Sequence, residues 1–237
     1  MLAFASAEKT KANPFILTAP PAIDADNIWV NHQQRTRLAP LSFAIASGER
    51  LAIVGQSGSG KSTLLQIFLG FCAYQGDIFI DNQNFNTINS TQFRHQIAYL
   101  SQQTMLLPMS IADNLRLPNP TASDDKLWQI LAQVGLKPLI KALPNQLDTQ
   151  LGERGSGLSG GQQRRLAIAQ LLLQDAQLWL LDEPTEHLDS ETAAEINALL
   201  QQVTRGKTVL WVTHDATNLP WLDRQISLDI ASTLAKA

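Results

Sequence analysis

The feature that most constrains the fold is a loop rich in glycine and serine that separates a buried strand from a helix. Its sequence, Gly55-Gln56-Ser57-Gly58-Ser59-Gly60-Lys61-Ser62, follows the apolar run 50–54 and precedes a predicted helix over 61–69. Glycines let the backbone curve closely around an anion, and the loop amides and the helix N-terminus supply partial positive charge. An ordinary Gly/Ser turn is the alternative, but the flanking strand and helix are the context that a phosphate-binding loop requires.

Composition narrows the class of protein further. Of the 237 residues, 44 % are hydrophobic and 16 % are charged, so the chain can bury a core and is not intrinsically disordered. The net charge of −3 gives no basic field, so we expect no nucleic-acid partner. No apolar run approaches the ~20 residues that cross a bilayer, and we find no signal peptide, so this chain is predicted to be soluble by itself. The single cysteine, Cys72, lies in an apolar stretch and is interpreted as a small core residue.

Alternation of strand-like and helix-like segments predicts an α/β fold. We expect residues 1–22 to be a linker or tail and residues 23–237 to form the folded domain. Buried strands that alternate with helices imply a mainly parallel sheet, and the early alternating strands suggest a second, smaller antiparallel sheet. Residues 104–165 are interpreted as a mostly helical insert. The strands are expected near 27–30, 41–45, 50–54, 76–81, 97–101, 177–181 and 208–213, and the helices near 61–69, 124–134, 159–174 and 190–203.

Two carboxylates follow the apolar run 178–181. Asp182, at the end of a buried strand beside the loop, can hold a Mg²⁺ ion together with Ser62, while Glu183 can polarise an attacking water. Lys61 would then reach the β- and γ-phosphates of a nucleotide. A solvated acidic turn is the alternative, and it would be the default interpretation without the phosphate loop.

A second anion-binding helix start occurs at Ser159-Gly160-Gly161-Gln162. Ser159 is a good N-cap, and the two glycines leave the backbone amides bare. One nucleotide does not need two such sites from a single chain, so we interpret the second as serving the nucleotide of a partner. A plain capped helix is the alternative, and it does not account for two glycines.

Taken together, the motifs of this chain resemble those of a known family. A phosphate loop, a Leu-Ser-Gly-Gly-Gln signature and an apolar-Asp-Glu strand end follow one another in the order of the ATP-binding-cassette (ABC) ATPases, and the resemblance covers about residues 23–230. It implies a P-loop NTPase fold, with a RecA-like core, a small antiparallel β-subdomain and a helical subdomain. It also implies an Mg²⁺-dependent ATPase whose cofactors are ATP and Mg²⁺.

The resemblance also implies roles for individual residues. Gln102 matches the Q-loop, which touches Mg²⁺, and Glu183 matches the general base. Asp189 matches the D-loop, which crosses the dimer interface, and His214 matches the switch histidine at the γ-phosphate. The implied nucleotide contacts are Gly55, Gln56, Ser57, Gly58, Ser59, Gly60, Lys61, Ser62, Thr63, Gln102 and Asp182, joined by Ser159, Gly160, Gly161, Gln162 and Asp189.

One position departs from the family pattern. The family stacks adenine on an aromatic side chain near the end of its first strand, where this sequence has His32. An imidazole stacks more weakly than a tyrosine ring, so adenine selectivity and ATP affinity are the properties in question. Trp29 is the alternative stacking residue.

Four segments are similar to exporters in particular. The Gly-Glu-x-Gly segment at 152–155 and the stretch 110–115 are exporter-like, and 70–76 and 184–189 resemble the CydD-type subunit of the heterodimeric thiol exporters. That resemblance implies export of cysteine or glutathione from the bacterial cytoplasm in support of cytochrome bd assembly. The C-terminal subunit of the same exporter and a lipid or peptide exporter remain open.

The family resemblance implies partners as well. We expect a second cassette, identical or different, and a transmembrane domain through which alone the chain meets the inner membrane, at its cytoplasmic face. Residues 1–22 resemble the linker that follows membrane helices in exporters. The membrane domain itself is therefore expected to be cut off or separately encoded. A non-transport cytosolic ABC ATPase would need a coiled-coil insert or a tandem cassette, and a P-loop kinase would need an acceptor site and a lid. A binding-only degenerate cassette is disfavoured by Lys61, Asp182, Glu183 and His214.

Overall fold

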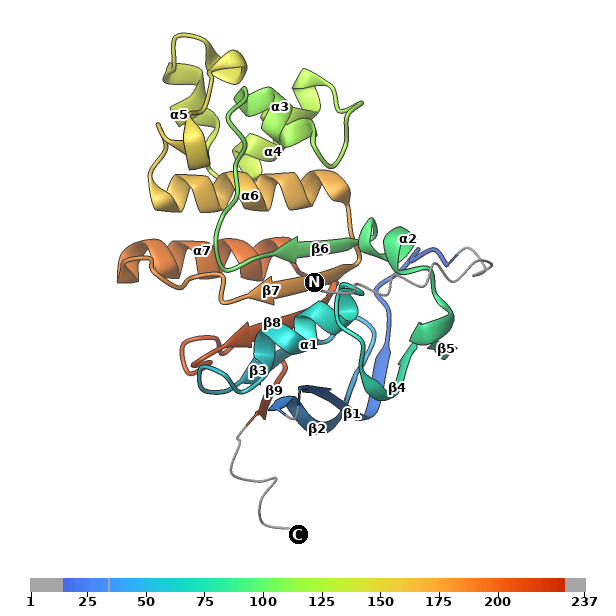
Figure 1. The fold of residues 1–237 in the computed structure, drawn as a ribbon. Helices are drawn as coiled ribbons and strands as arrows, with labels where there is room; N and C mark the ends of the chain where they lie inside the picture. The colour runs from blue at the N-terminus through green and yellow to red at the C-terminus, as the bar shows by residue number, and fades with distance from the viewer. Residues whose placement is uncertain (1–14, 34, 229–237) are drawn as a thin grey trace.

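The computed structural model describes residues 15–33 and 35–228, and it contains two sheets (Figure 1). One is antiparallel and has the strand order β2-β1-β4-β5, formed by Arg35–Ile45, Ile23–His32, Gln75–Ile80 and Gln83–Asn84. The other is parallel and has the order β6-β7-β8-β3-β9, formed by Ile97–Leu100, Leu178–Asp182, Thr208–Thr213, Arg50–Val54 and Arg224–Ser227. The predicted P-loop α/β fold with a small antiparallel sheet is confirmed.

The helices fall into two groups. Those near the parallel sheet are α1 (Lys61–Phe68), α6 (Gly160–Gln174) and α7 (Ser190–Val203), and the short α2 (Ser90–Arg94) precedes β6. Beyond α6 lies a helical layer of α3 (Ile111–Arg116), α4 (Asp124–Gln133) and α5 (Lys137–Ala142) (Figure 1). Short 3₁₀ turns occur at Phe85–Thr87, Gln146–Asp148 and Glu153–Gly155.

The parallel sheet separates two hydrophobic cores. Because side chains alternate along a strand, Leu178 and Leu180 of β7 pack toward α1 and the antiparallel sheet, while Trp179 and Leu181 pack toward α6 and the helical layer. All of β7 is buried, as a strand covered on both faces must be. Cys72, expected in the core, is only partly buried at its edge because it lies in the turn after α1.

Several short elements were not expected from the sequence. β9, α2, α3 and α5 span too few residues for a periodic pattern to stand out, and β1 is longer than the segment predicted for it. The N-terminal caps are better specified: Ser159 and Gln162 form a capping box at α6, with Ser159 Oγ 3.3 Å from Gln162 N. Among the described residues, no helix has both the length and the apolar character needed to span a membrane.

The parallel arrangement fixes where the site lies. Since β3, β7 and β8 run side by side in the same direction, their carboxyl ends meet at one edge of the sheet. The phosphate loop follows β3, Glu183 follows β7 and His214 follows β8. Residues far apart in the sequence are thereby brought to a single place.

Candidate active site

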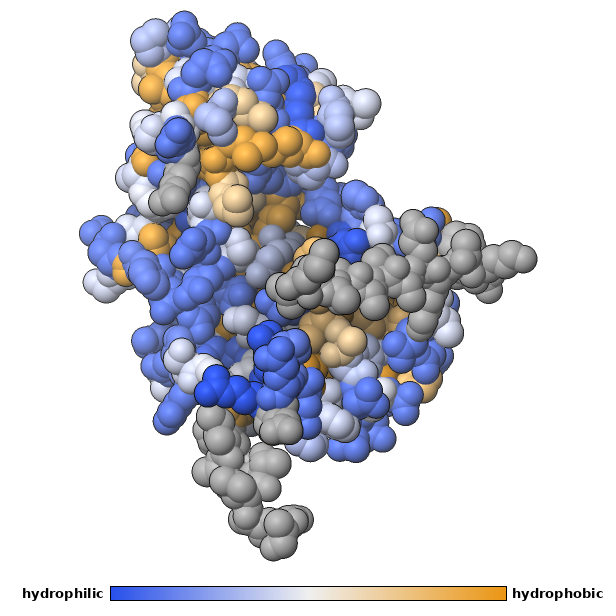
Figure 2. Space-filling model, in the orientation of Figure 1, coloured by the Kyte–Doolittle hydropathy of each residue, from blue (hydrophilic) through white to orange (hydrophobic). Residues whose placement is uncertain are grey.

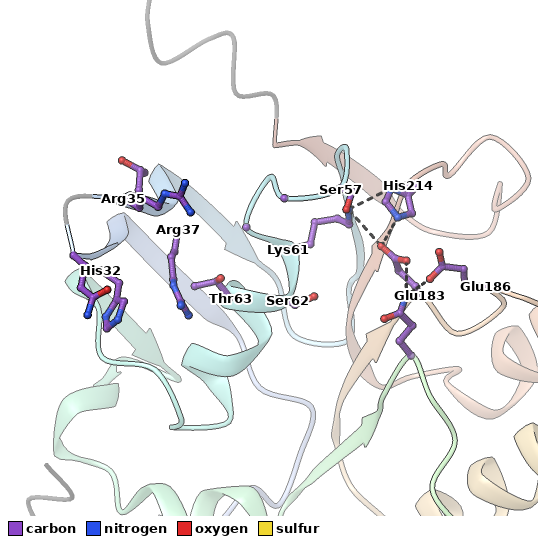
Figure 3. Close-up of a pocket in the computed structure, with 15 residues that line it drawn as sticks. His32, Arg35, Arg37, Ser57, Lys61, Ser62, Thr63, Glu183, Glu186 and His214 are labelled. Carbon is purple, nitrogen blue, oxygen red and sulfur yellow. Dashed lines mark hydrogen bonds and ion pairs between the residues drawn. The ribbon is translucent and has the colours of Figure 1, made fainter. Parts of the chain in front are cut away.

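A pocket of about 760 Å³ opens at this edge of the parallel sheet (Figure 3). One side is formed by the phosphate loop and the start of α1, another by the turn between β1 and β2, and a third by the segments after β6, β7 and β8. It is lined by His32, Gln33, Arg35, Thr36, Arg37, Ser57, Gly58, Gly60, Lys61, Ser62, Thr63, Gln102, Glu183, Glu186 and His214.

The phosphate loop adopts a conformation that requires glycine. Gly58 and Gly60 have φ angles of 81° and 102°, in the left-handed region. A Cβ atom on Gly60 would lie 2.6 Å from the backbone oxygen of Arg37, so the close approach of the loop to β2 also depends on this glycine. Gly60 caps α1 without a side-chain hydrogen bond, which leaves the first amides of the helix for an anionic ligand.

Lys61 curls back over the loop that precedes it. Its ammonium is almost fully buried and donates hydrogen bonds to the backbone oxygens of Gly55 (2.6 Å) and Gln56 (3.0 Å). Its Nζ also lies 3.4 Å from Glu183 Oε1. A buried cation is therefore held at the floor of the pocket, where a phosphate group would need positive charge.

Glu183 lies between Lys61 and His214. Its Oε1 atom is 2.9 Å from His214 Nε2, and only 8 % of the residue is exposed. Its φ of 44° is unusual for a residue with a side chain, and a backbone bond from its N–H to the oxygen of Val212 (3.0 Å) holds it there. Burial first, and then the neighbouring Glu186, raise the pKa of Glu183. The geometry thus presents a carboxylate of increased basicity to the pocket.

Asp182 lies behind the pocket lining. It is buried and accepts a hydrogen bond from Tyr99 Oη at 3.4 Å. Burial raises the pKa of Asp182, and burial next to this carboxylate raises the pKa of Tyr99 to about 12. The Asp182 carboxylate, the Ser62 hydroxyl and the Gln102 amide oxygen are hard oxygen donors of the kind that Mg²⁺ prefers. Ser62 and Gln102 line the pocket, whereas Asp182 does not.

Gln102 and Glu186 join the pocket from different segments. Gln102 Nε2 is 3.4 Å from Glu183 Oε2 and also donates to Glu186 Oε2 (Figure 3). One ligand atom each from Glu183, Glu186 and His214 lie within 4.8 Å of one another, so this group could also hold a cation. Glu186 was not predicted; its spacing from Glu183 along the turn after β7 was the only available signal.

The turn between β1 and β2 carries more charge than the sequence analysis recognised. His32, which we expect to stack on adenine, lines the pocket, whereas Trp29, the alternative, does not. Arg35 and Arg37 line it too, together with Thr36, at the start of β2. The start of a strand soon after His32 would have indicated this, but the strand was expected only from about residue 41.

Arg164 is a further residue that the sequence analysis missed. It lies on α6, is only 3 % exposed, and donates to backbone oxygens of the segments that carry Gln102 and Glu183. Burial lowers the pKa of Arg164 to about 10, so the side chain stays charged at neutral pH. The sequence alone does not indicate whether Arg164 or Arg165 is the buried arginine.

The signature residues and Asp189 lie apart from this pocket. Neither Asp189 nor the segment 159–162 lines it, and Asp189 caps α7 by accepting from Thr192 N at 2.9 Å. Hydrogen bonds from Thr192 keep the pKa of Asp189 low. A Cβ on Gly161 would lie 2.5 Å from Thr192 Cγ2, so close packing of α6 on α7 accounts for that glycine. A Cβ on Gly160 would make only an ordinary van der Waals contact, with Leu188 Cδ2 at 3.9 Å.

Fold and site together define a nucleotide-binding cassette of the P-loop class. Residues 38–186 match the sequence profile of the ABC transporter family. The chain belongs to this family.

Its relatives include exporters of more than one type. The glutathione/L-cysteine transport system ATP-binding/permease protein CydC of Escherichia coli K12 is 41 % identical over 198 residues, which is 83 % of this chain and 34 % of that protein. The CydD protein of the same organism is 33 % identical over 203 residues, covering 85 % of this chain and 34 % of that protein. The structure of a bacterial Atm1-family ABC exporter with ATP bound superposes with a TM-score of 0.84 at 31 % identity, covering 93 % of this chain and 39 % of that one.

These comparisons confirm an exporter-type cassette. Both the CydC and CydD proteins of the thiol system are among the relatives, and in E. coli the identity is higher to CydC than to CydD. This chain spans about a third of the length of these curated relatives.

Proposed function

We propose that this chain binds ATP and hydrolyses it as the motor domain of an ABC exporter. The observation that carries the proposal is the position of Glu183, which is buried between Lys61 and His214 at the mouth of the phosphate loop. A buried carboxylate with a raised pKa is suited to orient a water and to accept its proton.

Several groups in and beside the pocket would take part in this reaction. The amides of residues 57–63 and the Lys61 ammonium would hold the phosphates, with Lys61 exchanging its backbone partners for phosphate oxygens. Ser62, Gln102 and Asp182 would hold Mg²⁺, which when bound neutralises charge on the phosphates. His214 would hold the γ-phosphate, and His32 would stack on adenine, supported by Arg37 on the neighbouring strand.

We further propose that residues 23–237 form the cassette, with the helical subdomain at about 104–165, and that Ser159, Gly160, Gly161, Gln162 and Asp189 complete the site of a second cassette. The partner cassette is identical or different, and in a solution of the purified chain a second copy would take its place. Support comes from the placement of these residues outside the chain's own pocket.

The partner in the membrane would be a transmembrane domain, met at the cytoplasmic face of the bacterial inner membrane. Figure 2 shows apolar side chains on the helical layer in this view. Met105 and Leu107, which closely follow Gln102, are 79 % and 38 % exposed. Large exposed apolar side chains beside a catalytic segment favour docking of another domain there.

The cargo proposed is glutathione or cysteine, because the CydC and CydD relatives bear the name of a glutathione/L-cysteine transport system. The test is ATP-dependent accumulation of labelled glutathione or cysteine by vesicles that contain the full transporter. Accumulation of neither thiol, with ATP turnover intact, would contradict this cargo.

Hydrolysis itself is tested on the purified chain. We expect ATP binding by each chain, and a hydrolysis rate per chain that increases with protein concentration because two chains must meet. A rate per chain that does not change with concentration would count against the shared site. ATP binding with no hydrolysis at any concentration would instead indicate a binding-only cassette.

A further inference from the structure

Arg164 connects three parts of the molecule through one buried side chain. It projects from α6, soon after the capped start of that helix, and its guanidinium reaches two segments that lead into the pocket. Nη1 donates to the backbone oxygen of Ser101 (2.5 Å) and lies 3.4 Å from Thr104 Oγ1. Nε donates to the oxygen of Pro184 (2.6 Å), and Nη2 to that of Glu183 (3.4 Å).

The acceptors stand next to the residues that do the chemistry. Ser101 immediately precedes Gln102, and Pro184 immediately follows Glu183. The planar guanidinium holds its donors in a fixed fork, so it sets the separation of the two backbones that it bridges. On the pocket side, the Gln102 side chain makes a second connection to Glu183.

Simple packing does not explain a cation at this place. Arg164 is 3 % exposed, and within the described residues none of its hydrogen bonds goes to a carboxylate, although the negative charge of Asp182 favours the charged form. Burying a charge is unfavourable, and an apolar side chain of similar volume often stabilises such a position as well or better. The fork geometry is what an apolar side chain could not provide.

We propose that Arg164 is the positioning residue that couples the signature helix α6 to catalysis, by fixing the spacing between the segment of Gln102 and the turn of Glu183. This rests on the proposed ATPase function. When α6 moves against the parallel sheet, Arg164 moves the two segments with it. A movement of the start of α6 therefore changes the position of the Glu183 carboxylate.

The next residue provides a matched control. Arg165 lies on the same helix and also donates to a backbone oxygen, that of Val134 (3.0 Å), and to a carboxylate, that of Glu195 (2.7 Å). Its partners belong to the end of α4 and to α7 rather than to the pocket segments. Arg164→Gln and Arg165→Gln therefore remove the same chemical group from neighbouring positions.

The experiment measures kcat, KM for ATP, nucleotide affinity and Tm for the two variants and for Arg164→Lys. We expect kcat of Arg164→Gln to fall by about tenfold or more while KM and nucleotide affinity stay within about twofold, because misplacement of a catalytic group affects the transition state more than binding. Arg164→Lys should recover part of kcat, since it keeps the charge but not the fork. Arg165→Gln should keep kcat within about twofold of the wild type.

Two results would overturn the proposal. One is a wild-type kcat in Arg164→Gln; the other is an equal fall of kcat in both Gln variants, which would reflect general weakening of α6. Amide hydrogen exchange gives a readout that does not need turnover: Arg164→Gln should accelerate exchange in 101–104 and 183–186, and Arg165→Gln should not. A wild-type chain without turnover would remove the ATPase proposal, while unchanged exchange in those segments would remove the role of Arg164.

Discussion

Two glycine-marked helix starts in this protein have opposite surroundings. The start of α1 has no side-chain cap, contains the buried Lys61 and opens into the pocket. The start of α6 is closed by the Ser159–Gln162 capping box and contributes nothing to the pocket in the part of the chain that the structure describes. The capping box leaves the amides of Gly160 and Gly161 without an intrahelical partner. The first start thus belongs to this chain's own pocket, whereas the second is proposed to complete the site of a second cassette.

The largest effect is expected in the pocket at the start of α1. Glu183→Gln should lower kcat by about 10²–10⁴-fold while ATP binding is retained, because the amide cannot accept the proton but keeps the size of the side chain. The measurement is single-turnover hydrolysis beside equilibrium nucleotide binding. Glu191→Gln, on the exposed first turn of α7, is the control. Turnover near the wild-type level in Glu183→Gln would refute its role as the base.

Substitutions at Gly160 and Gly161 distinguish a contact with a partner cassette from a packing contact within the chain. Gly160→Asp adds a negative charge where a Cβ meets no clash, so we expect normal folding and ATP affinity but strongly reduced turnover. Gly161→Ala forces a methyl against Thr192 and should lower the free energy of unfolding by about 1–3 kcal/mol. Denaturant unfolding and ATPase assays on both variants distinguish the two contacts. Full turnover by Gly160→Asp would mean that α6 is only a capped helix.

A substitution at the end of the pocket that is proposed to hold adenine should have a smaller effect. His32→Tyr is expected to strengthen ATP binding by about 0.5–1 kcal/mol, since a larger ring stacks better on adenine. Trp29→Phe should leave binding unchanged because Trp29 does not line the pocket. Titrations with ATP and with inorganic triphosphate isolate the contribution of the base. Equal gains for both ligands in His32→Tyr would contradict a stacking role.

Substitutions at Asp189 separate two roles of one carboxylate. Asp189→Ala removes the cap of α7 and should slightly lower the free energy of unfolding, whereas Asp189→Asn keeps the cap. If Asp189 also contacts a second cassette, Asp189→Asn will reduce turnover although stability is preserved. Wild-type turnover in Asp189→Asn would mean that the carboxylate serves only as the cap of α7.

The same contrast explains what the sequence could predict. The phosphate loop, β7 and β8 are specified locally, by glycine spacing and by continuous apolar runs, and parallel pairing then brings Lys61, Glu183 and His214 together. Contacts that depend on tertiary packing were not visible. Nothing in the sequence distinguishes Arg164 from Arg165, and the need for glycine at 161 arises from Thr192 on another helix.

The shared site is tested most directly by mixing two inactive variants. Lys61→Ala damages the phosphate loop, and Gly160→Asp damages the signature end. In a mixed dimer one site carries both changes and the other carries neither, so we predict that the mixture hydrolyses ATP although neither variant does so alone. A mixture as inactive as its components, under conditions where the wild-type chain turns over ATP, would contradict a site completed by a second cassette.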